Sequence, residues 1–324
     1  MKICVFDDQV IITGANLSKD YFINRQDRYI RIQHGELSEY FVGLVQMVAE
    51  FSYSKNGHSA LKQPHFFDTI SRFEYRQYCK LKISNFMSHW LDRTSKLRDE
   101  LLDNPEMTHH TLIFPAVQLP CFDSVQDEVC MRNLLNQSLP GCDMHIASAY
   151  LNLPRVYKDA LLINPAQINL ISGSEKTNGF FASKGVSRFL PTTYSTLLLR
   201  FMKEIRDAHR ISEIKVYEYI KDGFTWHTKG IWIFPTLKQN QKMNSFMLTT
   251  IGSSNMNYRS VYRDLEAQVV IYTKDVDLSR RISDNMQELV YRNSRVVQID
   301  DLRSMQRMAP GWVKIASRLV KRFL

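Results

Sequence analysis

The residues best suited to chemistry lie in one segment in the last third of the chain. His227 and Lys229 open an apolar stretch, Gly252 and Asn255 follow a second one, and Glu266 closes an Arg-containing segment. Side chains two apart on a strand point the same way, so His227 and Lys229 can face one substrate. An imidazole beside cationic and amide groups that hold phosphate oxygens is suited to phosphodiester chemistry.

The beginning of the chain repeats this plan. Lys2 opens an apolar stretch, Asn16 follows the next one, and Asp27 closes an Arg-containing segment. Asp7 stands between the two apolar stretches beside a second acid, where a plain hairpin turn is the alternative to a catalytic role. The counterpart of His227 falls two positions before Lys2, ahead of the first numbered residue. We expect the two segments to face each other across one site.

Taken together, these segments resemble the phospholipase D superfamily, whose signature H-x-K-x4-D occurs twice per active site. The resemblance is strongest to the mitochondrial phosphatidylglycerophosphate synthases within it. It covers nearly the whole chain, through the stretches 7–18, 24–29, 178–181 and 258–268. The second motif departs from the signature, because Phe234 stands where the pattern has Asp.

The resemblance implies transfer of a phosphatidyl group from CDP-diacylglycerol to sn-glycerol 3-phosphate, which gives phosphatidylglycerophosphate and CMP on the route to cardiolipin. It implies catalytic roles for Lys2, Asp7, His227 and Lys229, and phosphate-binding or supporting roles for Asn16, Asp27, Asn255 and Glu266. Within this set, Glu266 is expected to hold the imidazole tautomer of His227. The resemblance implies no metal and no cofactor, and it places the activity on the mitochondrial inner membrane as a peripheral protein.

The first motif lacks its His within the numbered sequence. One imidazole of the superfamily forms a covalent intermediate and the other protonates the leaving group, so we expect a truncated or mis-started form with little activity. Two alternatives stay open: a phosphodiesterase of the same fold that uses water as acceptor, and a catalytically silent lipid-binding protein. Nucleic-acid binding is a weaker alternative, because the aromatic residues do not interleave with a basic patch.

The net charge of +9 favours anionic partners such as phospholipid headgroups or nucleotides. No apolar run reaches the length of about 18 residues that a membrane-spanning helix needs. Five cysteines without CxxC spacing predict reduced core thiols rather than a disulfide framework or a zinc site. On a helical wheel, residues 312–324 place apolar side chains on one side and basic ones on the other. This pattern fits a helix lying in a membrane interface or one docked on the core.

Alternating strand and helix segments predict an α/β layered fold, with two phospholipase D-like α/β/α halves of which the first is incomplete. The predicted units are 1–104, 105–300 and a basic amphipathic helix in 301–324, with a boundary at Pro105. Strands are expected over 29–32, 112–117, 144–147, 168–171 and 214–219, besides two that a turn at 7–8 joins. Helices are expected over 38–52, 67–102, 124–137, 154–162, 192–209 and 278–294.

Four local predictions accompany these elements. Ser38 is expected to cap the helix 38–52, and the helix 67–102 is expected to break near Ser84 or Thr94. Asn152 and Lys184 lie in stretches that resemble the pocket walls of the family. We interpret His109, His110 and His145 as structural, because no metal-ligand partner lies at usable spacing.

Overall fold

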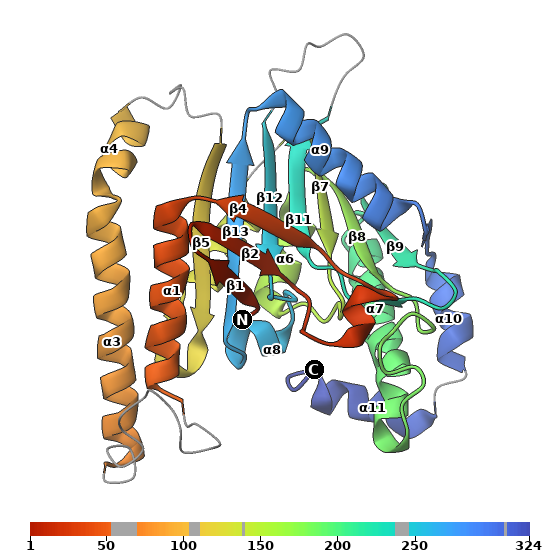
Figure 1. Ribbon diagram of the computed structural model, residues 1–324. Helices are drawn as coiled ribbons and strands as arrows, with labels where there is room; N and C mark the ends of the chain where they lie inside the picture. The colour runs from red at the N-terminus through yellow and green to blue at the C-terminus, as the bar shows by residue number, and fades with distance from the viewer. Residues whose placement is uncertain (53–69, 104–110, 138–139, 237–245, 308–309) are drawn as a thin grey trace.

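The computed structural model describes residues 1–52, 70–103, 111–137, 140–236, 246–307 and 310–324. A mixed sheet of nine strands runs through it in the order β14-β9-β8-β7-β11-β12-β13-β5-β6 (Figure 1). Its strands are β5 (Thr111–Leu119), β6 (Ser124–Val125), β7 (Cys142–Ala147), β8 (Gln167–Gly173), β9 (Ile214–Tyr219), β11 (Gly230–Pro235), β12 (Met247–Gly252), β13 (Glu266–Thr273) and β14 (Ser294–Val296). The neighbours β7, β8 and β9 pair in parallel, and the other neighbours pair antiparallel.

A smaller antiparallel sheet holds β1 (Ile3–Phe6), β2 (Gln9–Thr13) and β4 (Tyr29–Gln33), in that order. It repeats the antiparallel order β11-β12-β13 of the large sheet, with the motif lysine before the first strand and the motif asparagine after the second. The sequence repeat is therefore also a repeat of topology. Figure 1 shows the small sheet lying across β12, β13 and β5.

Helices cover both faces of the large sheet. They are α1 (Gly35–Glu50), α3 (Arg72–Arg93), α4 (Ser95–Asp103), α5 (Gln126–Asn136), α6 (Arg155–Ile163), α7 (Leu190–Asp207), α8 (Tyr258–Tyr262), α9 (Val276–Met286), α10 (Ile299–Arg307) and α11 (Gly311–Val320). One core lies between β7, β8, β9 and β11 and the helices α5, α6, α7 and α10. On the opposite face, α1, α3 and the small sheet pack against β5, β12 and β13. The apolar side of α9 covers the rest of that face.

The cap predicted at Ser38 is wrong. The helix α1 begins three residues earlier, and its N-cap is His34, whose Nδ1 accepts from the amide of Leu37 at 3.2 Å. Ser38 lies buried inside the first turn, where its own amide donates to the carbonyl of His34. The break in the next long helix falls at Thr94, which is one of the two positions predicted.

Some sequence predictions concern residues that the structure does not describe, and others differ from the observed elements or burial. Pro105, His109 and His110 lie outside the described residues. The unit predicted for 301–324 begins inside α10, so it holds the end of one helix and the whole of α11. No cysteine of the described chain is in a disulfide, but Cys121 is exposed, so it is not the core thiol that we predicted.

The last helix exposes the apolar side that the helical wheel defines. α11 buries Val313 and Ser317 against the protein. In contrast, Ile315 and Leu319 are 67% and 73% exposed, and Phe323 beyond the helix end is also exposed. No helix among the described residues is both long and apolar enough to cross a membrane.

Candidate active site

A parallel pair of two-residue strands joins the beginning of the chain to its last third. β3 (Arg25–Gln26) pairs with β10 (Thr225–Trp226), and the amide of His227 donates to the carbonyl of Gln26 at 2.9 Å. The next residue after each strand is Asp27 on one side and His227 on the other. The pairing thus holds these two side chains together although 200 residues separate them.

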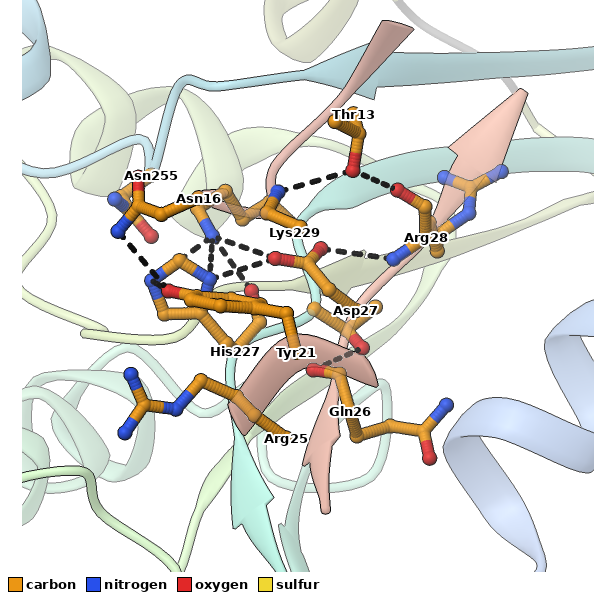
Figure 2. Close-up of polar contacts among 12 residues, drawn as sticks. Thr13, Asn16, Tyr21, Arg25, Gln26, Asp27, Arg28, His227, Lys229 and Asn255 are labelled. Carbon is orange, nitrogen blue, oxygen red and sulfur yellow. Dashed lines mark hydrogen bonds and ion pairs between the residues drawn. The ribbon is translucent and has the colours of Figure 1, made fainter. Parts of the chain in front are cut away.

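Asp27, His227 and Lys229 form a buried polar cluster (Figure 2). Asp27 Oδ2 lies 2.6 Å from His227 Nδ1 and 3.4 Å from Lys229 Nζ. Lys229 Nζ donates to the carbonyl of His227 at 2.6 Å and lies 2.7 Å from Nδ1. One ring nitrogen cannot donate to a carboxylate and accept from an ammonium at once, so we assign the proton on Nδ1 to the Asp27 contact. This tautomer leaves a lone pair on Nε2.

Burial controls the charge of this cluster. Burial, followed by the neighbouring Lys229, lowers the pKa of His227 to about 4, against the opposing effect of Asp27. Burial also lowers the pKa of Lys229 to about 8, although Asp27 favours its charged form. At neutral pH the imidazole is therefore neutral beside an ammonium. A bound phosphate would raise both pKa values, because its negative charge favours the protonated forms.

Tyr21 is a site residue that sequence reasoning missed. It lies in η1 (Lys19–Phe22), a single 3-10 turn in the loop before β3, and its ring meets that of His227 edge-on at 5.0 Å. Its hydroxyl lies 3.1 Å from His227 Nε2 and accepts from Asn16 Nδ2 at 3.3 Å. A hydroxyl on the Nε2 lone pair occupies the place that a reacting phosphate would need. The only sequence signal was an aromatic residue close after the motif asparagine.

Glu266 does not contact His227 in the structure, because Asp27 takes the place that we predicted for it. Glu266 is buried and accepts from Ser260 Oγ at 3.1 Å. Its negative charge acts on the amino group of Met1, which donates to the carbonyl of Leu265 at 2.8 Å. The pairing of acid and imidazole is therefore crossed between the repeats: the first repeat supplies the acid for the imidazole of the second.

The remaining motif lysine and asparagines lie around this cluster. Lys2 is close enough to the buried cluster for its charge to lower the pKa values of both His227 and Lys229. Asn16 is exposed and reaches the cluster through Tyr21. The backbone of Asn255 is fixed at both ends, since its amide donates to Ser260 Oγ and its carbonyl accepts from Ser148 Oγ. Its side-chain Oδ1 is buried without a partner among the described residues.

Gly14 lies where the end of β2 comes closest to the buried cluster, and there is no space for a side chain at this position. A Cβ at this position would lie 2.7 Å from Asp27 Oδ1 and 3.0 Å from Lys229 Nζ, which is closer than packed atoms allow. Only a residue without a side chain lets the strand end approach the buried carboxylate. Gly252, the last residue of β12, is crowded as well, by Gln268 and the carbonyl of Ala267.

The two positions that end the H-x-K-x4-D pattern lie away from the cluster. Asp7 is exposed in the tight turn between β1 and β2, at a positive φ of 52° and at the opposite end of β1 from Lys2. We therefore leave Asp7 out of the candidate active site. Phe234, in the equivalent place on β11, stacks on His145 with ring centroids 5.1 Å apart. A buried neutral His145, whose pKa burial lowers to about 4, accommodates this aromatic residue in place of an acid.

Aromatic residues form the wall beside His227. The ring of Tyr150 lies 6.2 Å from that of His227 and stacks on Tyr194 at 5.1 Å. Asn152, two residues further on, is buried and donates to the carbonyl of Lys321. Lys184 is exposed at the start of η3 (Gly185–Phe189), and the structure does not bring it to the cluster. No group of three or more potential metal ligands occurs among the described residues.

Comparison with known proteins identifies relatives over the whole chain. The chain is 30% identical, over 343 residues, to the human mitochondrial CDP-diacylglycerol–glycerol-3-phosphate 3-phosphatidyltransferase, with 100% of this chain and 60% of that protein covered. Identity to the Saccharomyces pastorianus CDP-diacylglycerol–glycerol-3-phosphate 3-phosphatidyltransferase is 29%, over 99% of this chain and 64% of that protein. The chain is similar in sequence to both of these enzymes. It spans about 60% of the length of the human protein. No protein-family model matches it.

Among solved structures, the phosphatidylserine synthase of Haemophilus influenzae superposes with a TM-score of 0.67 at 21% identity, over 100% of this chain and 70% of that one. At this identity the likeness speaks for the fold alone. The shared fold and the mixed sheet between helices confirm the layered α/β architecture that the sequence predicted.

Proposed function

We propose that this chain is part of a phosphatidyltransferase that moves a phosphatidyl group from CDP-diacylglycerol to sn-glycerol 3-phosphate and releases CMP. The observation that carries the proposal is the match of the whole chain to enzymes that are named for this reaction. The buried cluster of Asp27, His227 and Lys229 supports it, because it joins a neutral imidazole to a cation.

His227 is the proton-transfer residue of this proposal. Asp27 holds Nδ1–H, so that Nε2 faces the substrate once the hydroxyl of Tyr21 has moved aside. Binding of the anionic diphosphate favours the imidazolium, which gives the Nε2 proton to the departing CMP oxygen. His227, again neutral, then accepts the proton of the attacking glycerol hydroxyl. Lys229 and the side-chain amide of Asn255 hold the non-bridging oxygens.

The covalent step belongs to the imidazole that the repeat places two positions before Lys2. It attacks the phosphorus that carries the phosphatidyl group, and the bond from that phosphorus to the CMP oxygen breaks. The acceptor hydroxyl later displaces the imidazole. Glu266 lies next to the amino group of Met1, where it would accept Nδ1–H from this second imidazole as Asp27 does from His227. Lys2 and Asn16 complete the first-half set of phosphate ligands.

Peripheral binding to a membrane is the second part of the proposal, at the mitochondrial inner membrane. Exposed apolar side chains occur on segments that adjoin the site, namely Leu17, Phe22 and Ile23 near η1, Phe181 and Val186 in the loop before α7, and Ile315, Leu319 and Phe323 at the chain end. The ring of Trp312 in α11 packs on Phe189 at 4.7 Å, so the last two segments are continuous. Apolar residues beside a basic helix side favour an anionic lipid surface as the partner of the side of α11 that does not pack on the protein.

The test of the reaction is CMP release from CDP-diacylglycerol in mixed micelles, with and without glycerol 3-phosphate. We compare the chain as printed with a form that carries His immediately before Met1, which restores H-x-K at the first motif. Release that depends on glycerol 3-phosphate, together with an acid-labile phosphatidyl adduct on the restored form, is the expected result. Release without the acceptor indicates the phosphodiesterase alternative.

The test of membrane binding is co-sedimentation with vesicles of phosphatidylcholine and cardiolipin. The double variant Ile315→Asp and Leu319→Asp should lose binding, while Ile211→Asp, an exposed apolar residue far along the sequence from α11, should not. Vesicle binding that survives His227→Ala, without turnover in either form of the chain, would identify a catalytically silent lipid-binding protein. If the double variant in α11 and the Ile211→Asp variant bind vesicles equally well, the proposed contact surface is rejected.

A further inference from the structure

A cavity of about 420 Å³ lies between α6, α7, α8 and the C-terminal end of α11. Its volume is within the range of about 300–1,000 Å³ that is usual for small-molecule sites. The charged residues that line it are Arg155, Lys158, Arg200, Arg318 and Lys321, against a single carboxylate, Glu204. The roles given above to the site residues use none of these side chains.

The positive charges of this cavity are only partly compensated. Lys158 pairs with Glu204 at 3.0 Å, and Arg155 pairs with Asp159 at 2.7 Å outside the lining. Arg200 donates to the carbonyl of Lys314 at 2.7 Å, which holds its guanidinium against the first turn of α11.

Arg200, Arg318 and Lys321 have no carboxylate partner in the described part of the chain. Their positive charges repel the neighbouring cations and so lower the pKa values of those cations. Burial, and then Arg318, lowers the pKa of Arg200; burial lowers the pKa of Lys158, and Lys321 adds to that lowering. An anion between these groups would relieve both repulsions.

This cavity shares a wall with the candidate active site. Asn152 and Leu151 line it, and they directly follow Tyr150, whose ring lies 6.2 Å from that of His227. Tyr258 also lines it, three residues after Asn255. The hydrogen bond from Ser148 Oγ to the carbonyl of Asn255 joins the two segments of this wall at 2.6 Å. The cavity therefore lies next to the two segments that carry Tyr150 and Asn255.

We propose that the cavity binds a phosphate monoester dianion. Resting on the proposed function, we infer that this is the phosphate of the glycerol 3-phosphate acceptor. Uncompensated guanidinium and ammonium groups match a dianion better than the singly charged phosphodiester of an ordinary phospholipid. A phosphate held at this wall would direct the free hydroxyl end of the acceptor toward His227. The same phosphate chemistry occurs in a lipid-borne form, phosphatidic acid, and the experiment separates the two sources.

The experiment measures binding directly, so it does not depend on turnover. The double variant Arg318→Gln and Lys321→Gln removes two cations whose side chains make no ion pair with a described carboxylate. The control variant, Lys215→Gln and Arg281→Gln, removes the same charge from exposed positions on β9 and α9. Isothermal titration calorimetry with glycerol 3-phosphate, inorganic phosphate and uncharged glycerol gives the dissociation constants at fixed ionic strength.

We expect the wild type and the control to bind glycerol 3-phosphate equally, and the cavity variant to bind it about 10- to 100-fold more weakly. Glycerol should not bind measurably. Equal affinity of the wild type and the cavity variant overturns the proposal, and so does the absence of phosphate binding to the wild type. Thermal unfolding of both variants excludes a loss of fold as the cause.

Two further arms assign the source and separate this proposal from the proposed function. If vesicles with phosphatidic acid bind in a way that the cavity variant loses, while glycerol 3-phosphate does not bind, the assignment to the acceptor is overturned in favour of a lipid. If the restored form turns over with an unchanged KM for glycerol 3-phosphate in the cavity variant, the cavity proposal fails while the reaction stands. If glycerol 3-phosphate binds here but CDP-diacylglycerol never releases CMP, the reaction fails while the cavity proposal stands.

Discussion

Replacing Asp27 by asparagine should destabilise the protein by about 3 kcal/mol at pH 7. The carboxylate of Asp27 and the ammonium of Lys229 are each only 1% exposed, and Asp27 also accepts from His227 at 2.6 Å. Removing one partner of a buried ion pair costs about 3–5 kcal/mol, because the other charge stays buried without compensation. We expect the lower end of this range, since the amide oxygen of the substituted side chain can still accept one of the two hydrogen bonds.

The pH dependence of this loss distinguishes the charge effect from a packing defect. Asp27 raises the pKa of Lys229, so the variant should hold its ammonium less well than the wild type, in which that pKa is about 8. The wild type then binds a proton that the folded variant does not, up to about pH 8. The difference in unfolding free energy should therefore shrink as the pH rises toward 8 and stay constant above it.

Urea unfolding at pH 6 and pH 9 gives both quantities, with the m-value as a check on two-state behaviour. Asp20→Asn is the matched control, because the Asp20 carboxylate is 60% exposed and 3.6 Å from Arg25, and it should cost less than about 1 kcal/mol. Adding Lys229→Met to the Asp27 variant should recover part of the loss. A loss below about 1 kcal/mol at pH 6, or no recovery in the double variant, would refute the argument.

Three further outcomes follow from the same cluster. As the pH falls from about 6.5 to about 4, the unfolded chain binds a proton at His227 that the folded chain does not bind, so the unfolding free energy should drop by about 3 kcal/mol. The His227→Gln variant should show a smaller dependence of the unfolding free energy on pH in urea titrations. An unchanged pH dependence would contradict the assignment. Gly14→Ala should cost about 1–3 kcal/mol and displace Asp27, seen as a shifted imidazole resonance, because its Cβ has no space; a neutral effect would mean that the strand end moves freely. Tyr21→Phe removes a hydroxyl that stabilises the lone pair on Nε2, so NMR titration should show a higher pKa for His227, and a lower pKa would argue against this donor.

The repeat and its recurring lysine and asparagine could be predicted because they depend on local sequence. Lys before an apolar strand and Asn after the next one recur at both ends of the chain, and strand periodicity predicts which side they share. The antiparallel strand orders β1-β2-β4 and β11-β12-β13 follow from that pattern. The exposed turn at Asp7 was also available from the sequence, as the simple alternative to a catalytic role.

The choice of acid for His227 could not be predicted, because it depends on a contact across 200 residues. The resemblance assigned this role to Glu266, which belongs to the same repeat as His227. The pairing of β3 with β10 instead brings Asp27 to His227. This pairing could not be predicted, because two residues per strand are too few to give a periodic signal. Tyr21 was missed for a related reason, since a single 3-10 turn inside a polar loop has no pattern of its own.

The short strand pair β3–β10 also determines when the protein can become functional. Its two strands lie far apart along the chain, and neither pairs with a strand of the large sheet. Such a distant contact forms late in folding, because the entropy of closing the intervening chain must first be overcome. In a chain that is cut or only partly folded, His227 would lack its contact with the Asp27 carboxylate. Activity at this site would therefore require the completed fold.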